Sequence, residues 1–361
     1  MNNFFALAIL AALFICARPA AAGDALEAGF GRRSLVTERA GVSLGGYGGR
    51  GLLPVVTGVH DPVFAKAMVL RTPGRAIALV TVDLIGVQRT MLDALREHPL
   101  PARVGLRADD VIICASHTHA SYGSLARPTG APGLDALFFV CCGPFRREFF
   151  DEVVEKVRGA LTDAWDDLRP ARLGVGAEDV PGLAHNRGRS GAPVDPEIGV
   201  VKVTDLDGAV RGLVVNFAGH PVFLGADNFQ VSAEYPGAMQ RALEERFPGA
   251  TAMFTQGAEG DVTANGAGDS DDAFARLEAT GRRLADVVAR IQERIEVRAD
   301  VAIDARTRAL EMPRPSGARD RLKSLGGVSR SVFCEAVLGD TLLMGIPGEP
   351  CCRIGLDLKA G

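Results

Sequence analysis

Short apolar runs alternate along this chain with longer stretches in which apolar residues recur at helical spacing, and this alternation constrains the fold most. Short runs of β-branched and aliphatic residues predict buried strands, whereas a period of about 3.6 residues predicts amphipathic helices. The predicted strands are 75–84, 111–115, 199–204, 212–217, 251–255 and 340–346. The predicted helices are 88–98, 144–165, 235–247 and 272–295. The pattern predicts an α/β fold in which mixed β-sheets are flanked by helices.

The composition is that of a globular protein with a large core. Of the 361 residues, 47% are apolar and 23% are charged, which excludes a disordered chain, a collagen-like repeat and a coiled coil. The formal net charge is −4 and basic residues never run beyond two in a row, so the chain lacks the basic surface that nucleic-acid binding requires. The length fits one large domain or two.

The first residues predict export. Residues 4–16 form an apolar run that is too short for the roughly 20 residues of a membrane-spanning helix, and small residues at Ala20, Ala21 and Ala22 follow it. We therefore expect a signal peptide over residues 1–22 and a mature chain over 23–361, exported to the periplasm or secreted. No later segment is long enough to predict a transmembrane helix.

Six cysteines remain once Cys16 is removed with the signal peptide. In an oxidising compartment they are expected to form disulfides or to be buried thiols, and their spacing selects no pairing. They are Cys114, Cys141, Cys142, Cys334, Cys351 and Cys352.

Polar side chains follow five of the predicted strands at the point where each strand ends. They are Asp83 and the segments 116–119 (SHTH), 218–221 (AGHP), 256–261 (QGAEGD) and 347–349 (PGE). Because the carboxyl ends of strands in such sheets open onto a shared crevice, we expect the active site there.

Three histidines and one carboxylate in these segments predict a metal site. His117 and His119 are two residues apart, so on an extended backbone both imidazoles project from one face. With His220 and Glu349 they make a set of two or three histidines and one carboxylate, which suits Zn²⁺ with one position left for water. The alternative is that these histidines are capping or core groups with no ligand.

The glycine-rich segment 257–266 contains four hydrogen-bonding side chains. Glu259, Asp261, Thr263 and Asn265 would form a substrate-side wall with donors for an oxyanion, or the segment is simply a turn between a strand and a helix.

Three further positions are candidates in loops or turns. Arg187 can bind a substrate carbonyl with its forked donors, or it is an ordinary surface arginine. His60 and Asp61 lie in a turn, and Asp61 or Asp83 can orient a metal-bound imidazole.

Two short motifs lack the context that their usual functions need. Residues 41–45 fit G-x-S-x-G and residues 46–51 fit G-x-G-x-x-G. Neither is preceded by a buried strand and followed by a helix, and Pro54 bars a helix start. We expect 45–51 to be a loop that lines the pocket. A serine hydrolase that uses Ser43 is the competing enzyme class.

These motifs, in their order along most of the mature chain, resemble the neutral/alkaline (non-lysosomal) ceramidase family, specifically its zinc-dependent N-terminal catalytic domain. The segments that carry the resemblance are 58–62 (GVHDP), 82–84 (VDL), 116–119 (SHTH), 186–187 (NR), 217–221 (FAGHP), 260–265 (GDVTAN) and 347–349 (PGE).

The resemblance implies a role for each matched residue. His117, His220 and Glu349 would hold the zinc ion. His119 would handle the proton or contact the oxyanion, and Arg187 would lie near the substrate carbonyl.

The sequence departs from the family at three points. Thr263 stands where the ceramidases have a serine. The family's zinc has a tyrosine ligand downstream of the PGE glutamate, whereas Tyr47, Tyr122 and Tyr235 all precede Glu349, so the fourth ligand is missing. The family also continues into an immunoglobulin-like domain, and we expect that this sequence is a truncated form rather than a short relative.

Together with this resemblance, the sequence predicts an exported zinc-dependent hydrolase of amide bonds in N-acyl, ceramide-like substrates. Such an enzyme would act in sphingolipid metabolism. The partner is a small-molecule or lipid N-acyl substrate, and residues 134–140 (LDALFFV) are the apolar candidate for the funnel that a lipid substrate needs. Peripheral membrane contact is a further expectation, to which the sequence assigns no residues. The alternatives are an exported small-ligand-binding protein without catalysis and an esterase on the same scaffold. The sequence does not predict an oligomeric state.

Overall fold

The computed structural model describes residues 26–97, 100–101, 103–129, 132–311 and 330–360. The predicted signal peptide, residues 1–22, lies outside the described residues.

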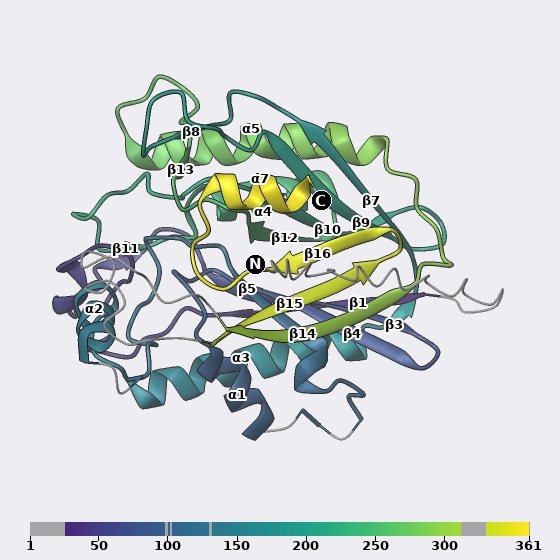
Figure 1. Cartoon of the computed structure of the whole chain (residues 1–361), viewed down its shortest axis with the longest axis horizontal. Helices are drawn as coiled ribbons and strands as arrows, with labels where there is room; N and C mark the ends of the chain where they lie inside the picture. Colours follow the sequence, from purple (N-terminus) through teal and green to yellow (C-terminus); the bar gives the residue numbers. More distant parts are fainter. Residues whose placement is uncertain (1–25, 98–99, 102, 130–131, 312–329, 361) are drawn as a thin grey trace, which may run out of the picture.

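Two β-sheets pack face to face in the centre of the molecule (Figure 1). The first has the order β5-β4-β3-β1-β6 and the second the order β12-β10-β9-β7. The strands of the first are β1 (Glu27–Ser34), β3 (Phe64–Thr72), β4 (Arg75–Val82), β5 (Val111–Ala115) and β6 (Arg169–Pro170). Those of the second are β7 (Arg172–Asp179), β9 (Glu197–Thr204), β10 (Val210–Phe217) and β12 (Thr251–Gln256).

Helices cover the outer face of each sheet, which gives four layers (Figure 1). The helices α1 (Arg89–Glu97) and α3 (Arg147–Asp166) pack on the first sheet, and α4 (Glu234–Arg246) and α5 (Ala273–Glu293) pack on the second. In α3 the buried residues recur every three or four positions, from Phe149 to Ala164, so the helix turns one apolar face to the sheet.

The remaining elements are shorter or lie at the periphery. A third sheet, in the order β14-β15-β16, adds side chains such as Ile303 to the core between the two main sheets. The elements are β14 (Ile303–Glu311), β15 (Arg330–Leu338), β16 (Thr341–Gly345), the paired β2 (Gly58–Val59) and β11 (Gln230–Val231), the paired β8 (Ala184–Asn186) and β13 (Val262–Ala264), the 3-10 helices η1 (Arg50–Leu52) and η2 (Ala108–Asp110), α2 (Pro132–Cys142) and α7 (Cys352–Lys359).

The predicted fold class is confirmed. The six predicted strands correspond to β4, β5, β9, β10, β12 and β16, and the four predicted helices to α1, α3, α4 and α5. Both main sheets are mixed, because β4 pairs with β5 and β10 with β12 in parallel whereas their other neighbours are antiparallel. The parallel pairs bring the carboxyl ends of β4, β5, β10 and β12 to the edges where the site lies.

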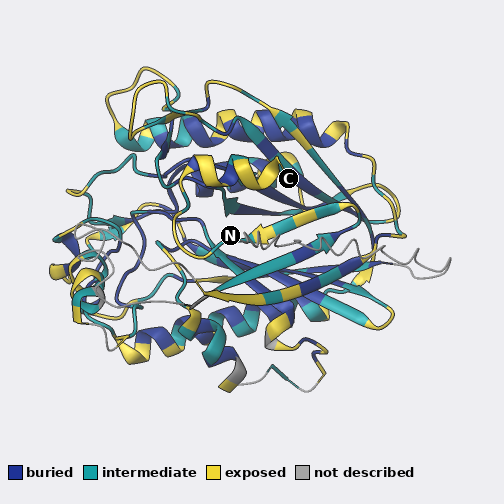
Figure 2. Cartoon of the chain, in the orientation of Figure 1, coloured by how far each residue is buried: buried dark blue, intermediate teal, exposed yellow. Residues whose placement is uncertain are grey.

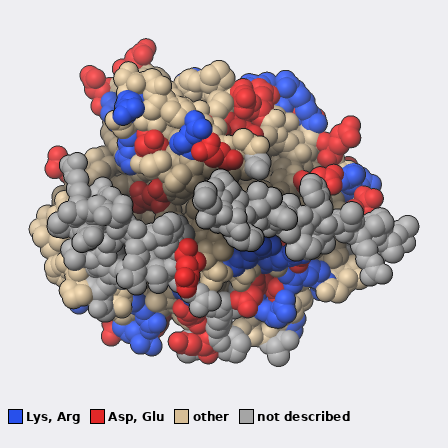
Figure 3. Space-filling view, in the orientation of Figure 1, with Lys and Arg blue, Asp and Glu red and all other residues tan. Residues whose placement is uncertain are grey.

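The surface carries charges of both signs. On the described part of the face in Figure 3, acidic and basic side chains are interspersed rather than gathered into one basic surface. No helix among the described residues has the length and apolar composition that crossing a bilayer requires. Five cysteines of the predicted mature chain, Cys114, Cys141, Cys142, Cys351 and Cys352, are free thiols in the structure.

Candidate metal centre

Three loops bring the predicted metal ligands together. His117 and His119 follow β5, His220 follows β10, and Glu349 follows β16. The ring atoms of the three histidines that can bind a metal all lie within 4.8 Å of one another. Residues more than 200 positions apart in sequence therefore share one small volume at the strand ends.

The three imidazoles turn the same nitrogen toward a common centre. His117 Nε2 lies 3.2 Å from His220 Nε2 and 3.3 Å from His119 Nε2. The other nitrogen of two of these rings meets backbone carbonyl oxygens: His117 Nδ1 lies 2.6 Å from the oxygen of Ile85, and His220 Nδ1 lies 2.8 Å from that of Glu259. A carbonyl only accepts, so Nδ1 carries the proton in both rings and Nε2 presents a lone pair.

This arrangement fits a metal ion. Two lone pairs that face each other at 3.2 Å repel unless a cation lies between them or beside them. Protons do not fill that role at neutral pH, because burial lowers the pKa of His117 and lowers that of His119 to about 3. Neutral imidazoles oriented through Nδ1 are the form in which histidine binds metals.

Glu349 adds the carboxylate to the histidine cluster. Its Oε1 lies 3.6 Å from His117 Nε2, and its Oε2 lies 3.6 Å from His220 Nε2. The side chain is 54% exposed, so the centre is open on the Glu349 side.

Arg187 contacts the same centre from the side of the paired strands β8 and β13. It follows β8, and its Nη2 donates to His220 Nε2 at 2.8 Å and to the carbonyl oxygen of Gly260 at 3.2 Å. The residue is exposed, so its guanidinium lies at the open side of the cluster. In this structure Arg187 is thus the hydrogen-bond donor that satisfies the lone pair of His220.

The backbone at His117 differs from the expectation. An extended chain was expected to place His117 and His119 on one face, but His117 has a φ of 63°, in the left-handed region. That part of the expectation is wrong, and the conformation costs about 1 kcal/mol for a residue other than glycine. The turn directs the His117 ring back to Ile85 while its Nε2 still meets His119, with the two ring planes at 83°.

Backbone carbonyls, rather than Asp83 or Asp61, hold the ring nitrogens of the ligand histidines. The Asp83 carboxylate accepts from the Phe64 backbone at 2.9 Å and from Gln240 at 3.4 Å, and thereby links β3 to α4. Burial raises the pKa of Asp83.

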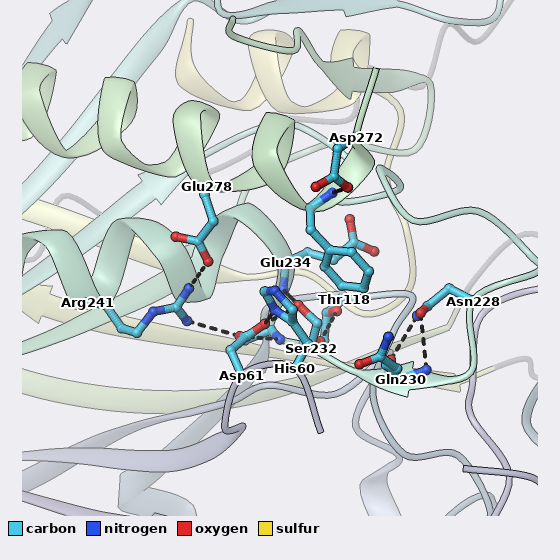
Figure 4. Close-up of polar contacts among 12 residues, drawn as sticks. His60, Asp61, Thr118, Asn228, Gln230, Ser232, Glu234, Arg241, Asp272 and Glu278 are labelled. Carbon is cyan, nitrogen blue, oxygen red and sulfur yellow. Dashed lines mark hydrogen bonds and ion pairs between the residues drawn. The ribbon is translucent and has the colours of Figure 1, made fainter. Parts of the chain in front are cut away.

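Asp61 acts on the histidine segment through intermediates (Figure 4). Its carboxylate accepts from the Ser232 hydroxyl, and the Ser232 carbonyl accepts from Thr118 Oγ1 at 2.9 Å. Thr118 lies between the two histidines of the SHTH segment. Asp61 therefore supports that segment at a distance of two hydrogen bonds.

A second group of metal-binding side chains consists of His60, Asp61 and Glu278 (Figure 4). Here a cation is already present, because Arg241 bonds to Asp61 at 3.0 Å and also to Glu278. His60 Nδ1 lies 2.9 Å from Asp61, and its ring stacks on Phe274. Arg241 pairs with both carboxylates of this group, whereas Arg187 bonds to one of the three histidines in the first group, so this group is better described as an ion-pair network than as a second candidate metal centre.

The segment 257–266 forms one wall beside His220. Thr263 lies in β13, pairs with His185 of β8 and forms a bridge with His220. Asn265 Oδ1 lies 2.6 Å from His185 Nδ1, so this side chain contacts the neighbouring strand β8.

Asp261 ties this wall to the segment that bears Glu349. Its carboxylate accepts from the Asn186 amide at 2.9 Å and from the backbone of Cys352 at 2.7 Å. The amide of Gly260 donates to the Pro350 carbonyl at 2.9 Å. These bonds fix the residues that directly follow Glu349.

Gln256 begins the segment 256–261, but the sequence analysis assigned it no role of its own. Its Nε2 donates to the carbonyls of Ser116 at 3.3 Å and Gly219 at 3.1 Å, and its Oε1 accepts from the amides of Gly219 at 3.1 Å and Gly257 at 3.3 Å. One side chain thus joins the loops of His117 and His220. The sequence feature that could have identified Gln256 is its position as a polar residue directly after a predicted strand.

Arg50 is the second residue that was missed. It is buried, and it donates to the carbonyls of Gly45 and His119 and, at 3.3 and 3.2 Å, to those of Gly225 and Asn228. It therefore holds the glycine-rich loop against the histidine segment, as the expectation of a pocket-lining loop at 45–51 requires.

Ser43 does not have the setting of a nucleophile. It is fully buried, and its hydroxyl donates to the carbonyl of Gly51 at 2.9 Å. This placement does not favour the serine-hydrolase alternative.

Comparison with known proteins gives a consistent match. The family model described as "Neutral/alkaline non-lysosomal ceramidase, N-terminal" matches residues 27–280, which include every residue of the centre except Glu349. The "Neutral ceramidase" of Pseudomonas aeruginosa is 23% identical over 99% of this chain and 55% of its own length. That of Oryza sativa subsp. japonica is 24% identical over 60% of this chain and 28% of its own length.

Solved structures share the fold. The crystal structure of neutral ceramidase from Pseudomonas aeruginosa superposes with a TM-score of 0.78 and 18% identity, covering 93% of this chain and 64% of that one. A structure titled "Ceramidase complexed with C2" also gives a TM-score of 0.78, with 19% identity. The chain spans about half the length of the bacterial relative. Because the family model covers most of the chain, this protein belongs to the neutral/alkaline non-lysosomal ceramidase family.

Proposed function

We propose that this protein is a zinc-dependent hydrolase of the amide bond in N-acyl substrates of the ceramide type. The observation that carries the proposal is the convergence of three imidazoles, each with Nε2 turned inward, beside a half-exposed carboxylate. His117, His220 and Glu349 would hold the ion. When bound, zinc supplies Lewis-acid chemistry, which polarises a carbonyl and makes water a stronger nucleophile at neutral pH.

His119 is the group proposed to move the proton. Its Nε2 faces the cluster, and its Nδ1 is buried with no hydrogen-bond partner among the described residues. Burial lowers its pKa to about 3, so the ring is neutral and free to accept a proton from the attacking water at Nε2. Negative charge that develops on the substrate oxygen would stabilise the protonated ring until the proton passes to the leaving amine.

Arg187 and Thr263 are the groups proposed to stabilise the oxyanion. The Arg187 guanidinium already points at the cluster through its bond to His220, and a ligand on that lone pair would free Nη2 to donate to a substrate oxygen. The Thr263 hydroxyl would replace the serine of the ceramidases on the strand beside His220.

The proposal is tested by product release. The purified protein is given an N-acylsphingosine, a water-soluble N-acyl amide and the matching ester, and free fatty acid is measured by mass spectrometry. We expect amide hydrolysis that a chelator abolishes and zinc restores. Glu349→Ala should be inactive yet folded, and Ser43→Ala should stay active. Hydrolysis of the ester alone would replace the proposal with an esterase, and ligand binding without turnover would replace it with a binding protein.

Export is part of the same proposal. Cleavage after Ala22 would release a chain that begins at Gly23 into the periplasm or the medium. Amino-terminal sequencing of protein recovered outside the cytoplasm would give Gly23 as the first residue. Recovery of the protein only in the cytoplasm, with Met1 retained, would contradict it.

A further inference from the structure

The helix α2 is apolar around its circumference but lies at the surface. Its sequence from Pro132 to Cys142 has one charged residue, Asp135, and none of its described side chains is buried (Figure 2). By contrast, α3 and α5 each bury one face and expose a charged one. A helix that is apolar all round normally lies in a core or in lipid. At 11 residues, α2 is too short to span a bilayer and has the length of an interfacial segment.

The outward face of α2 presents only apolar groups. Successive residues of a helix are about 100° apart, so Ala136, Leu137, Phe139 and Val140 fall within an arc of about 160°. All four are exposed, Leu137 to 55% and Phe139 to 49%.

A second segment extends this face. Leu52, Leu53 and Val55 are also exposed, and they belong to or follow η1, which packs against α2. The amide of Gly49 donates to the Val140 carbonyl at 3.1 Å, which joins the two segments. We call the six side chains of Leu52, Leu53, Val55, Leu137, Phe139 and Val140 the apolar surface.

The apolar surface borders the metal centre. The amide of Gly46 donates to the carbonyl of Cys141 at 3.0 Å, and a Cβ at Gly46 would lie 2.6 Å from His119 Nδ1. Arg50, the first residue of η1, bonds to the His119 carbonyl. The same short loop thus contacts both α2 and a residue of the centre.

We propose that the apolar surface docks the protein on the surface of a lipid bilayer and so brings the metal centre to substrates held there. The identity of the substrate rests on the proposed function, whereas the docking does not. Lipid fits better than a protein partner because none of the six side chains can form a hydrogen bond or an ion pair. Protein interfaces are typically anchored by Trp, Tyr and Arg with hydrogen bonds around them.

Vesicle flotation tests the docking directly. The probe is a vesicle of phosphatidylcholine, which has no net charge, at about 0.1 M and about 1 M salt. Wild-type protein should float with the vesicles equally at both salt concentrations, since apolar insertion is not screened. The variant Leu137→Glu/Phe139→Glu should bind at least about tenfold more weakly. The control Leu206→Glu, at a side chain 50% exposed in the turn between β9 and β10, should bind like the wild type.

A second double variant tests whether a loss of binding could be explained by misfolding. Leu52→Glu/Leu53→Glu alters the same surface from η1 and should show the same loss, with circular dichroism spectra like the wild type for both variants. Flotation unchanged in both variants, or wild-type flotation abolished by high salt, would overturn the proposal. A change of oligomeric state in the variants, with flotation retained, would also overturn it and assign the surface to a second copy of the chain.

Docking and catalysis are separated by two further measurements. Glu349→Ala lacks the proposed turnover but should float like the wild type, so docking stands even if no N-acyl substrate is hydrolysed. Turnover of a water-soluble N-acyl amide should be unchanged in Leu137→Glu/Phe139→Glu, while turnover of a long-chain substrate in vesicles should fall at least about tenfold. Equal turnover of the vesicle substrate by variant and wild type would contradict the docking role.

Discussion

His117 and His220 face each other through Nε2 atoms 3.2 Å apart, while backbone carbonyls hold the Nδ1 atom of each ring. This relationship decides the chemistry of the centre, because it fixes the tautomer of both rings and turns the Nε2 lone pair of each toward the same point. The backbone carbonyls of Ile85 and Glu259 therefore orient the two rings, as a carboxylate does in many metal sites.

Gly46 leaves room for the His119 ring, so a methyl group there should disturb the centre. In Gly46→Ala the new Cβ would lie 2.6 Å from His119 Nδ1 at a residue whose φ is 106°. We expect a loss of about 2 kcal/mol in the free energy of unfolding and at least a tenfold loss of turnover. The matched control is Gly48→Ala, since nothing lies within 4 Å of a Cβ at Gly48. Denaturant unfolding and kinetics give both values, and equal behaviour of the two variants would contradict the role of Gly46.

Gln256 should be needed for the metal centre although it is not a ligand. In Gln256→Leu the backbone groups of Ser116, Gly219 and Gly257 lose four hydrogen bonds, so we expect unfolding to become easier by about 2 kcal/mol and metal affinity to fall. The control is Gln292→Leu, because the Gln292 amide bonds to Ala289 within its own helix. Metal titration that gives the wild-type affinity for Gln256→Leu would refute the bridging role.

Glu234 should make stability depend on pH. Burial raises its pKa to about 8 from the ordinary value of 4.5, so the fold favours the protonated carboxyl. Its contribution is complete below pH 4.5 and is lost as pH rises through 8, because the unfolded chain releases the proton first. Between these values the wild type should lose roughly 1.4 kcal/mol per pH unit relative to Glu234→Gln. Unfolding free energies at about pH 5 and about pH 8 measure the difference, and parallel profiles would show that the carboxyl is ionised in the fold.

Arg187 should affect turnover more than metal binding. Arg187→Ala removes the donor proposed for the oxyanion, so kcat should fall by about a hundredfold. Metal affinity should stay the same or increase, because the guanidinium no longer occupies the lone pair of His220. Arg189→Ala, at an exposed arginine of the same loop, is the control. Loss of metal in Arg187→Ala would mean that the arginine supports the centre rather than the reaction.

Much of the fold could be predicted because its central strands and long helices have strong periodic patterns. The strands that the sequence analysis did not predict show why the remaining elements could not be found from such patterns. In β1 the residues Gly29 and Gly31 replace apolar side chains, because α3 packs so closely that a Cβ would lie 2.0 and 2.2 Å from its backbone. A strand with glycine on its buried face has no apolar alternation to detect. The helix α2 was missed because its uniform apolar sequence has no helical period.

The site was predictable where side chains carry the chemistry. The histidines and Glu349 were found because they follow predicted strands and have ligand chemistry. The orienting groups were not, since any residue can supply the carbonyl of Ile85 or Glu259. Arg50 was not found either, because its role depends on loops that come together only in the fold.

The zinc content of the purified chain tests the central claim most directly. Elemental analysis after dialysis should give one zinc ion per chain for the wild type and none for His117→Ala. His185→Ala, which alters the histidine beside Asn265, and His60→Ala, which alters the Arg241 network, should both retain the ion. Zinc retained by His117→Ala, or lost only in His60→Ala, would contradict a metal centre at His117, His220 and Glu349.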